Sequence, residues 1–345
     1  MIAGEYSVTR SRRRAIVMGV NRGITARTTP SMSKSVSLQY NQRSETIRIE
    51  KLCSTDYLHY VSPDNSYALH LVAKIANLAQ SMGVRFTGAK IAIDSDLDDP
   101  LLRVKYGLGG SSAVAASLAV SLDAYLGLAL DRDRLWKLSY LATIETNPQA
   151  SGADLAAALY GGWVHYRSPD REWLTDKIDN TELRALICAD WPGLEIERLT
   201  RPPDAGALVV GWSGTPATTA DLVTAARSRI SNDFLEHSDR TVAGLSKALS
   251  TADYSATAHY VRQAQAHFED LDSPPVGILT DNLRTMILES SKLGVPAKVS
   301  GAGGGDCCIA FPSDIHHQRA LTQRWNDLGF PVLPLSPAPE AEAPE

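Results

Sequence analysis

The stretch that most constrains this chain runs from Lys105 to Val114 and reads KYGLGGSSAV. Its glycines allow the backbone to approach an anion closely, and a long pattern of small residues follows, ending near Leu126. The helix predicted there would direct free N–H groups at such an anion. The stretch is typical of two structures, a phosphate-binding loop and a tight turn into a buried helix, and alone it does not separate them.

Composition limits the classes of function. The chain has 345 residues, of which 44% are hydrophobic and 21% charged, so it is long enough for one large or two ordinary domains with sizeable cores. Its formal net charge of -5 argues against a general binder of nucleic acid or of anionic membranes. We therefore expect no nucleic-acid partner, and any anionic substrate needs a local basic site.

Cysteine use and hydropathy favour a cytoplasmic protein. The cysteines lack the paired spacing of a metal site, and Cys307 and Cys308 are neighbours, which disfavours a disulfide framework. No apolar run reaches the length of a membrane span, and the N-terminus has no signal-peptide pattern. We expect a reducing, cytoplasmic location and no membrane partner.

Hydrophobic spacing predicts a mixture of helices and strands. We expect helices over 67–82, 113–126, 132–146, 222–249, 254–271, 276–293 and 316–328. We expect strands near 1–9, 15–20, 24–29, 85–93, 160–166, 207–212, 297–300, 308–311 and 332–335, with the opening ones forming a small antiparallel unit. The hydroxyl-rich segment 28–44 is predicted to be a surface loop. The acidic segment 94–100 is interpreted as a solvated connection in preference to a metal site.

Asp154 is the acidic residue that opens an alanine-rich helix pattern after Ser151-Gly152. One interpretation is that its carboxylate complements the dipole of that helix, as acidic residues in a first turn commonly do. The other is that the carboxylate faces the same cavity as the glycine stretch. The residues alone leave both interpretations open.

A proline pair divides the chain. Pro202-Pro203 precedes an apolar strand, which predicts domains over 1–203 and 204–335. The second domain carries a hydroxyl-rich turn from Ser213 onward and a second glycine-rich loop from Ser300 to Asp306. The tail 336–345 is rich in Pro, Ala and Glu, and we predict that it is disordered.

Taken together, three stretches resemble the GHMP kinase superfamily: AGEY at 3–6, the glycine stretch 107–113, and 300–306. Within it the sequence is most similar to the bacterial phosphomevalonate kinases, on the blocks KYGLGGSSAV, SGADLAAALYGGW, VGWSGTPATTADLV and AKVSGAGGGDCCIAF. The resemblance implies an α+β fold of two domains with the active site in the cleft between them. It also implies that the N-terminal domain is related to a left-handed β-α-β unit.

The resemblance implies a reaction as well. MgATP would phosphorylate the terminal phosphate of (R)-5-phosphomevalonate, giving (R)-5-diphosphomevalonate in the mevalonate route to isoprenoids. The expected cofactors are ATP and Mg²⁺, the expected partner is this small-molecule substrate, and the expected assembly is a monomer or a homodimer.

Matched to the family motif, one run of residues is expected to wrap the ATP phosphates: Gly107, Leu108, Gly109, Gly110, Ser111, Ser112 and Ala113. The family usually reads Gly-Leu-Gly-Ser-Ser-Gly here. An alignment without a gap puts the two serines on Gly110 and Ser111, so Ser111 is the hydroxyl expected near the metal. Ser112 restores the lost hydroxyl one position later.

The remaining site residues are expected on the acceptor side or as cations. Asp154 matches the family's acidic residue, and we assign it to positioning the acceptor, because a phosphate is already ionised at neutral pH and needs little help from a base. Lys105 is expected to stabilise the charge of the transferred phosphoryl group. Asp306 is expected to cap its turn in preference to binding metal. Substrate contacts are expected from Ser151, Ser213, Gly301, Ala302, Gly303 and Gly304.

One departure concerns a lysine that in the family precedes AGEY by four residues, a position that lies before Met1. Three explanations stay open. The first is that the sequence starts too late. The second is that Lys105 and the arginines of the turn 10–14 compensate for the lysine. The third is that catalytic power is lost and the chain is a ligand-binding relative. In the second case, Arg12 and Arg13 would add positive field near the substrate. A mevalonate kinase or a diphosphomevalonate decarboxylase is the alternative among enzymes, against which the GWSGTPATTADLV block speaks.

Overall fold

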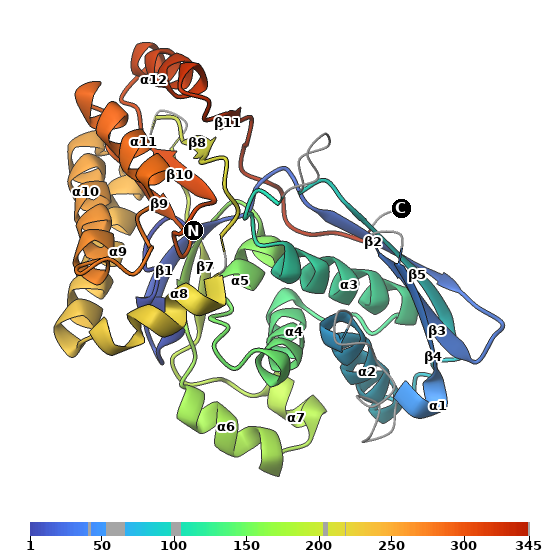
Figure 1. Cartoon of the computed structure of the whole chain (residues 1–345). Helices are drawn as coiled ribbons and strands as arrows, with labels where there is room; N and C mark the ends of the chain where they lie inside the picture. Colours follow the sequence, from blue (N-terminus) through green and yellow to red (C-terminus); the bar gives the residue numbers. More distant parts are fainter. Residues whose placement is uncertain (41–42, 53–65, 98–104, 203–205, 218, 344–345) are drawn as a thin grey trace.

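The computed structural model describes residues 1–40, 43–52, 66–97, 105–202, 206–217 and 219–343. Within these ranges the chain forms three separate sheets with helices packed between and around them (Figure 1). Two sheets belong to the N-terminal half and one to the C-terminal half. The mixture of helix and sheet confirms the expected α+β class.

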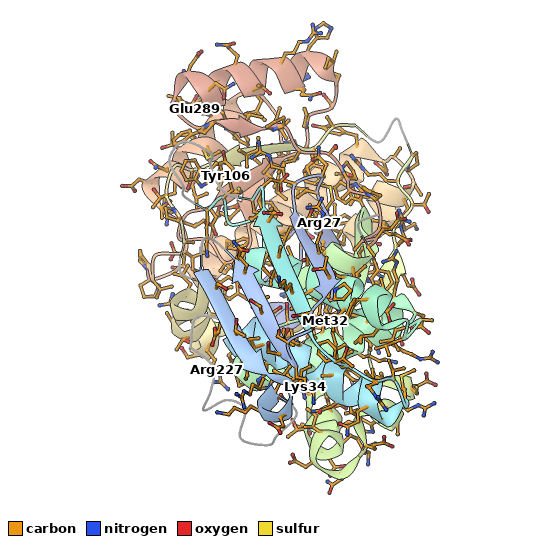
Figure 2. All side chains as sticks on the ribbon, turned by 90° about the vertical axis from the view of Figure 1, so that its right-hand side faces the viewer. Arg27, Met32, Lys34, Tyr106, Arg227 and Glu289 are labelled. Atoms are coloured by element: carbon orange, nitrogen blue, oxygen red, sulfur yellow. The ribbon has the colours of Figure 1, made fainter. Side chains whose placement is uncertain are left out.

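The outermost sheet of the N-terminal half is four-stranded, in the order β2-β5-β3-β4. Its strands are β2 (Ile24–Pro30), β3 (Ser35–Tyr40), β4 (Arg43–Arg48) and β5 (Ala89–Ser95). β3 and β5 run parallel, and the other pairs are antiparallel. Helices α2 (Ser66–Ser81) and α3 (Gly110–Leu126) lie against the inner face, and the short α1 (Ile49–Leu52) follows β4. Figure 2 looks onto the outer face, on which Arg27 is exposed.

The surface loop predicted over 28–44 is wrong, because most of that segment lies in β2, β3 and β4. Val36 and Leu38 point into the core, and serine and glutamine alternate with them on the outer face. This alternation is typical of a strand with one buried and one solvent-exposed face. The many hydroxyl side chains on the exposed face made the segment resemble a loop in the sequence.

The second sheet has the order β1-β6-β7 and supports the segment that carries Asp154. Its strands are β1 (Arg14–Met18), β6 (Trp163–Arg167) and β7 (Glu195–Arg198). Around it and between the two N-terminal sheets lie α4 (Arg132–Thr146), α5 (Ala153–Tyr160), α6 (Arg171–Asn180) and α7 (Leu183–Cys188).

The predicted opening strand and its antiparallel unit are wrong. Ala3 makes a single bridge to Ile16, and Ser7–Thr9 form one turn of 3₁₀ helix, η1. β1 and β2 belong to different sheets. The first residues instead bury Ile2 and Tyr6 in clusters shared with the C-terminal half, so long-range packing overrides their local pattern.

The C-terminal half is built on the sheet β11-β8-β10-β9. The strands are β8 (Val209–Trp212), β9 (Ala297–Ser300), β10 (Cys307–Ala310) and β11 (Val332–Leu333). Helices α9 (Asn232–Ser250), α10 (Tyr254–Leu271), α11 (Asp281–Lys292) and α12 (Ile315–Asp327) pack beside it (Figure 1). β7 and β8 lie in different sheets, and the predicted boundary at residue 203 lies outside the described residues, so its exact place stays a prediction.

The helix predicted over 222–249 is broken into α8 (Thr219–Ala226), a 3₁₀ turn η3 (Arg227–Arg229) and α9. The hydroxyl of Ser231 accepts a hydrogen bond from the N–H of Phe234 (3.1 Å), which starts a new helix at that point. A side-chain cap of this kind stabilises a helix start by about 1 kcal/mol, enough to restart the helix in a new direction.

The tail differs from its predicted disorder over the described residues 336–343. The N–H of Ala338 donates to the carbonyl of Gly19 (2.9 Å), and the N–H of Gly162 donates to the carbonyl of Ala338 (2.8 Å). Glu340 forms ion pairs with Arg132 and Arg198, both at 2.8 Å. Backbone hydrogen bonds and these ion pairs order a segment that is poor in apolar side chains, as the red trace crossing the molecule in Figure 1 shows.

Glu289 joins α11 to α12 and makes stability depend on pH. Its carboxylate lies 2.8 Å from Arg324 Nε and 2.6 Å from Lys292 Nζ. The hydrogen bond from Arg324, followed by that from Lys292, lowers the pKa of Glu289 from 4.5 to about 2. Because the folded pKa is depressed, the ion pairs stabilise the fold fully above the unfolded pKa and lose that effect as pH falls through the folded one.

We therefore expect the stability advantage of the wild type over Glu289→Gln to shrink as pH falls from 5 to 2, within the range of the shift from 4.5 to about 2. Thermal midpoints of both proteins over that range test this. Two curves that stay parallel would contradict the assignment of the effect to Glu289, whose position is marked in Figure 2.

Candidate functional site

The first glycine loop, residues 107–110, has the backbone form of an anion cradle. Gly107 and Gly109 have φ of 75° and 82°, a region that favours glycine. α3 begins at Gly110, three residues before the predicted start, and Gly109 provides no side-chain cap for the first turn. Ser111 is exposed on that turn. An uncapped helix start with an exposed hydroxyl fits a polyphosphate and its metal ion.

The first turn of α3 is held from behind by α2. The hydroxyl of Tyr67 donates to the carbonyl of Ser111 (2.8 Å). Burial raises the pKa of Tyr67 to about 12, so its hydroxyl stays a donor at neutral pH. This contact fixes the backbone of Ser111 and leaves its side chain toward solvent.

Asp154 lies directly beside the first glycine loop. A Cβ placed on Gly109 would be 3.6 Å from Asp154 Cβ and 3.8 Å from its Cγ. Asp154 is exposed on the first turn of α5, while the residues on either side of it are buried. The geometry favours the second of the two interpretations, a carboxylate that faces the same space as the glycine loop.

A cage of aromatic rings sets the direction of α5. Gly152 caps this helix with φ of 82°, and a Cβ there would lie 2.6 Å from Trp136, 2.8 Å from Tyr166 and 2.9 Å from Tyr140. Trp136 Nε1 donates to the carbonyl of Gly152 (3.1 Å), and the Tyr166 hydroxyl donates to the backbone carbonyl of Ser151 (2.6 Å). Only glycine fits inside this cage, which fixes the helix start two residues before Asp154.

Arg171 closes the cage from α6. Its guanidinium donates to the carbonyl of Pro148 (2.8 Å) and to that of Ala150. Ser151 in turn accepts a hydrogen bond from the N–H of Ala153 (3.2 Å). The segment 148–153 is therefore held by side chains from α4, α6 and β6, and Ser151 is presented at its turn.

The second glycine loop, residues 300–306, connects β9 to β10. Gly301 has open space where a Cβ would lie, and Gly301 and Ala302 are half-buried. Gly303 is buried against Ile278, and the N–H of Gly304 donates to the carbonyl of Ile278 (2.8 Å). The open part of the loop is therefore at Gly301 and Ala302, and the N–H of Gly304 is already engaged.

The hydroxyl-rich turn, residues 213–217, packs against the second glycine loop. Ser213 is only 1% exposed and its hydroxyl donates to the carbonyl of Thr215 (3.3 Å), so it shapes the turn from inside. Asn282 supports the same residue by donating to its carbonyl (2.9 Å). Thr215 is exposed and offers the accessible hydroxyl of the turn.

The two glycine loops meet at Asp306. A Cβ on Gly107 would overlap the carboxyl group of Asp306, so the carboxyl group is in contact with that glycine. Asp306 Oδ1 accepts a hydrogen bond from the N–H of Ala217 (3.0 Å). Burial raises the pKa of the Asp306 carboxyl, although the hydrogen bond from Ala217 opposes the shift. The first glycine loop, the second glycine loop and the hydroxyl-rich turn thus meet at Asp306.

The predicted cations lie in different surroundings. Lys105 is exposed two residues before the first glycine loop. Arg12 and Arg13 are engaged in ion pairs with Asp170 (2.7 Å) and Asp239 (2.9 Å). The turn 10–14 is therefore bound to Asp170 at the start of α6 within the N-terminal half and to Asp239 of α9 in the C-terminal half. The hypothesis that these two arginines supply field at the substrate is not supported.

The AGEY segment has a role that the sequence did not indicate. Glu5 pairs with Lys298 (2.5 Å) in β9, and the lysine is fully buried. The hydroxyl of Tyr6 donates to the carbonyl of Ala302 (2.5 Å) in the second glycine loop. Buried residues near the two ends of the sequence therefore contact each other and the second glycine loop, across almost 300 positions, which no local pattern reveals.

The acidic segment 94–100 falls partly outside the described residues. Asp94 lies 3.6 Å from Arg27, and Asp96 accepts a hydrogen bond from the N–H of Gly23. Over the described ranges, no group of three or more His, Cys, Asp or Glu side chains could hold a metal ion. Of the helices that the structure describes, none is long and apolar enough to cross a membrane.

Comparisons with known proteins identify the family to which the chain is similar. The model of the GHMP kinases N terminal domain matches residues 67–162, and that of the GHMP kinases C terminal matches residues 245–329. Phosphomevalonate kinase of Streptomyces sp. (strain CL190) is 35% identical over 288 residues, which are 79% of this chain and 75% of that protein.

Solved structures extend the match over the whole chain. A Listeria innocua protein superposes with a TM-score of 0.90 at 26% identity, over 98% of this chain and 95% of its own. Streptococcus pneumoniae phosphomevalonate kinase in complex with phosphomevalonate and AMPPNP has a TM-score of 0.83 at 26% identity, over 97% of this chain and 96% of its own. The two-domain fold expected from the motifs is confirmed, and the chain belongs to the GHMP kinase family.

Proposed function

We propose that this chain is a phosphomevalonate kinase, which transfers the γ-phosphate of ATP to the phosphate of (R)-5-phosphomevalonate and releases (R)-5-diphosphomevalonate and ADP. The observation that carries the proposal is the meeting of the two glycine loops with Asp154 beside one of them. The relative that is 35% identical to this chain over 288 residues carries the same activity in its name.

The donor side is the first glycine loop with the start of α3. Backbone N–H groups of the first turn, from Gly110 to Ser112, point out of an uncapped helix and suit the ATP phosphates. Ser111, exposed on this turn, is our proposed hydroxyl for Mg²⁺, which when bound neutralises charge on the phosphates. Ser112 and Ala113 complete the half-buried wall, and Lys105 is the proposed cation at its entrance.

Asp154 is proposed to position the acceptor. A phosphate monoester is ionised at neutral pH, so the reaction needs alignment and charge stabilisation more than proton removal. The aromatic cage fixes the start of α5, and this places the carboxylate against Gly109 without a flexible joint. An acceptor aligned at that point would lie next to the donor loop, as in-line transfer requires.

The acceptor contacts follow from what is accessible. Ser151 lies at the caged turn, and Gly301 and Ala302 form the open part of the second glycine loop. Thr215 offers the exposed hydroxyl opposite. Ser213, Gly303 and Gly304 are predicted site residues whose place in our proposal is to shape these two segments from behind.

The test is ADP release by the purified chain with MgATP and 5-phosphomevalonate, with mevalonate as the control acceptor. We expect turnover only with the phosphorylated acceptor. Turnover with mevalonate alone would identify a different GHMP kinase and contradict the proposal. Thermal shifts with ATP and with 5-phosphomevalonate but no ADP would identify a ligand-binding relative, because binding raises the unfolding temperature without chemistry.

A further inference from the structure

Asp306 lies where the ATP side and the acceptor side of the proposed site touch. Its carboxyl group occupies the space beside Gly107 that any larger residue would need. Gly107 belongs to the N-terminal half and Asp306 to the loop between β9 and β10. A side chain of the second half therefore packs directly on the backbone of the first glycine loop.

Asp306 is also bound to the hydroxyl-rich turn through three hydrogen bonds. The N–H of Ala217 donates to Oδ1 (3.0 Å), the N–H of Asp306 donates to the carbonyl of Thr215 (2.7 Å), and the N–H of Ser213 donates to the carbonyl of Asp306 (2.8 Å). Asp306 has φ of 54°, in the left-handed region that Asp tolerates better than most residues. These hydrogen bonds fix the position of the carboxyl group relative to the turn.

The adjacent residues repeat the contact. Cys307 Sγ donates to the carbonyl of Tyr106 (3.3 Å). The rings of Tyr106 and Trp212 meet edge to face, with centroids 5.6 Å apart. Two successive residues of the first half, Tyr106 and Gly107, thus contact two successive residues of the second. Figure 2 shows Tyr106 beyond the end of the outer sheet, toward the C-terminal half.

We propose that Asp306 is a positioning residue that holds the first glycine loop in register with the hydroxyl-rich turn, and this rests on the function proposed above. It acts through Gly107 and Ala217 rather than on the substrates. In-line phosphoryl transfer depends on the alignment of donor and acceptor, and a displacement of about 1 Å can lower a rate by about 10²-fold. For this role the Asp306 side chain needs its shape and the hydrogen bond that it accepts from Ala217, and it does not need its negative charge.

The test compares Asp306→Ala, Asp306→Asn, Gly107→Ala and the double variant Gly107→Ala/Asp306→Ala, with Asp314→Ala, an exposed cap of α12, as control. Asp306→Ala should lower kcat and raise the KM for both substrates by about tenfold each, whereas Asp306→Asn should stay within about twofold of wild type. Gly107→Ala should be worse than Asp306→Ala. In the double variant the added methyl no longer meets the carboxyl group, so Gly107→Ala should cost less there than in the wild type.

Additive effects of the two substitutions would overturn the proposal, and so would an Asp306→Asn variant as impaired as Asp306→Ala. Failure of the proposed function is recognised separately, because the wild type itself would then show no turnover. In that case the coupling between positions 107 and 306 is measured from the unfolding free energies of the wild type, Asp306→Ala, Gly107→Ala and the double variant. A contact between the two residues predicts that the effects are not additive, and its absence predicts a simple sum.

Discussion

Replacing Asp154 by Asn is expected to lower kcat by about 10² to 10³-fold and to leave the unfolding temperature nearly unchanged. The side chain is exposed on the first turn of α5, so little of the fold depends on it. Its carboxylate nevertheless lies against Gly109, at the point where donor and acceptor must be aligned. Steady-state rates with saturating MgATP and 5-phosphomevalonate measure the effect.

The matched control is Asp233→Asn. Asp233 is exposed and is the second residue of α9, as Asp154 is of α5, so both substitutions remove the same interaction with a helix dipole. We expect the control to retain wild-type kcat. An Asp154→Asn variant that matches its control in kcat would show that this carboxylate only complements its helix.

The second large effect is on stability. Lys298→Met should lower the free energy of unfolding by about 3 to 5 kcal/mol, because it leaves the carboxylate of Glu5 buried without its partner. Lys298 is completely buried, with Nζ 2.5 Å from Glu5 Oε1 and 5.1 Å from the centre of the Phe268 ring. Glu5 itself is 8% exposed. Urea unfolding of the variant beside wild type measures the loss.

A second substitution separates charge from packing. In the variant Glu5→Gln/Lys298→Met no buried charge is left unpaired, so we expect it to be more stable than Lys298→Met alone. A loss below about 1 kcal/mol for Lys298→Met, the size typical of an exposed pair, would contradict the role assigned to this ion pair.

Elements with strong local signals could be predicted from the sequence. The ranges expected for α4 and α10 agree with the structure at both ends, where Asp131 and Asp253 cap the helix starts through hydrogen bonds to Arg134 and Ala256. Capping and helical spacing are local, so they are readable without the rest of the chain. The sequence pattern did not indicate the break between α8 and α9 or the start of α11 at Asp281 instead of at residue 276, because the apolar spacing continues across both positions.

Long-range order could not be predicted in the same way. The tail is ordered by the backbone of Gly19 and Gly162 and by two arginines far from it in sequence. The first residues were expected in a strand, but they pack across the molecule onto β9 and the second glycine loop. The conformations of the tail and of the first residues are therefore determined by distant residues that they contact, and not by their own local sequence.

For the candidate site, the motifs singled out segments that the structure brings together, but they did not indicate how these segments are arranged. That Asp154 faces the first glycine loop is a matter of three-dimensional placement, and the sequence left it open. The aromatic cage was visible only as Trp136 and Tyr140 at helical spacing, a pattern that core residues share. Ser213 is expected from the resemblance to contact the substrate, and the structure shows that its side chain is buried, a property that depends on what packs behind the turn and that the sequence does not reveal.

The phosphorus NMR spectrum of the product formed with MgATP identifies the acceptor of the transferred phosphoryl group, which we propose is the phosphate of 5-phosphomevalonate. We expect two mutually coupled signals of a diphosphate ester in addition to the signals of ADP, because the new bond joins two phosphorus atoms through oxygen. Inorganic phosphate with ADP alone, or a product with two uncoupled monophosphate signals, would rule out this acceptor, since water or a hydroxyl would then have received the phosphoryl group.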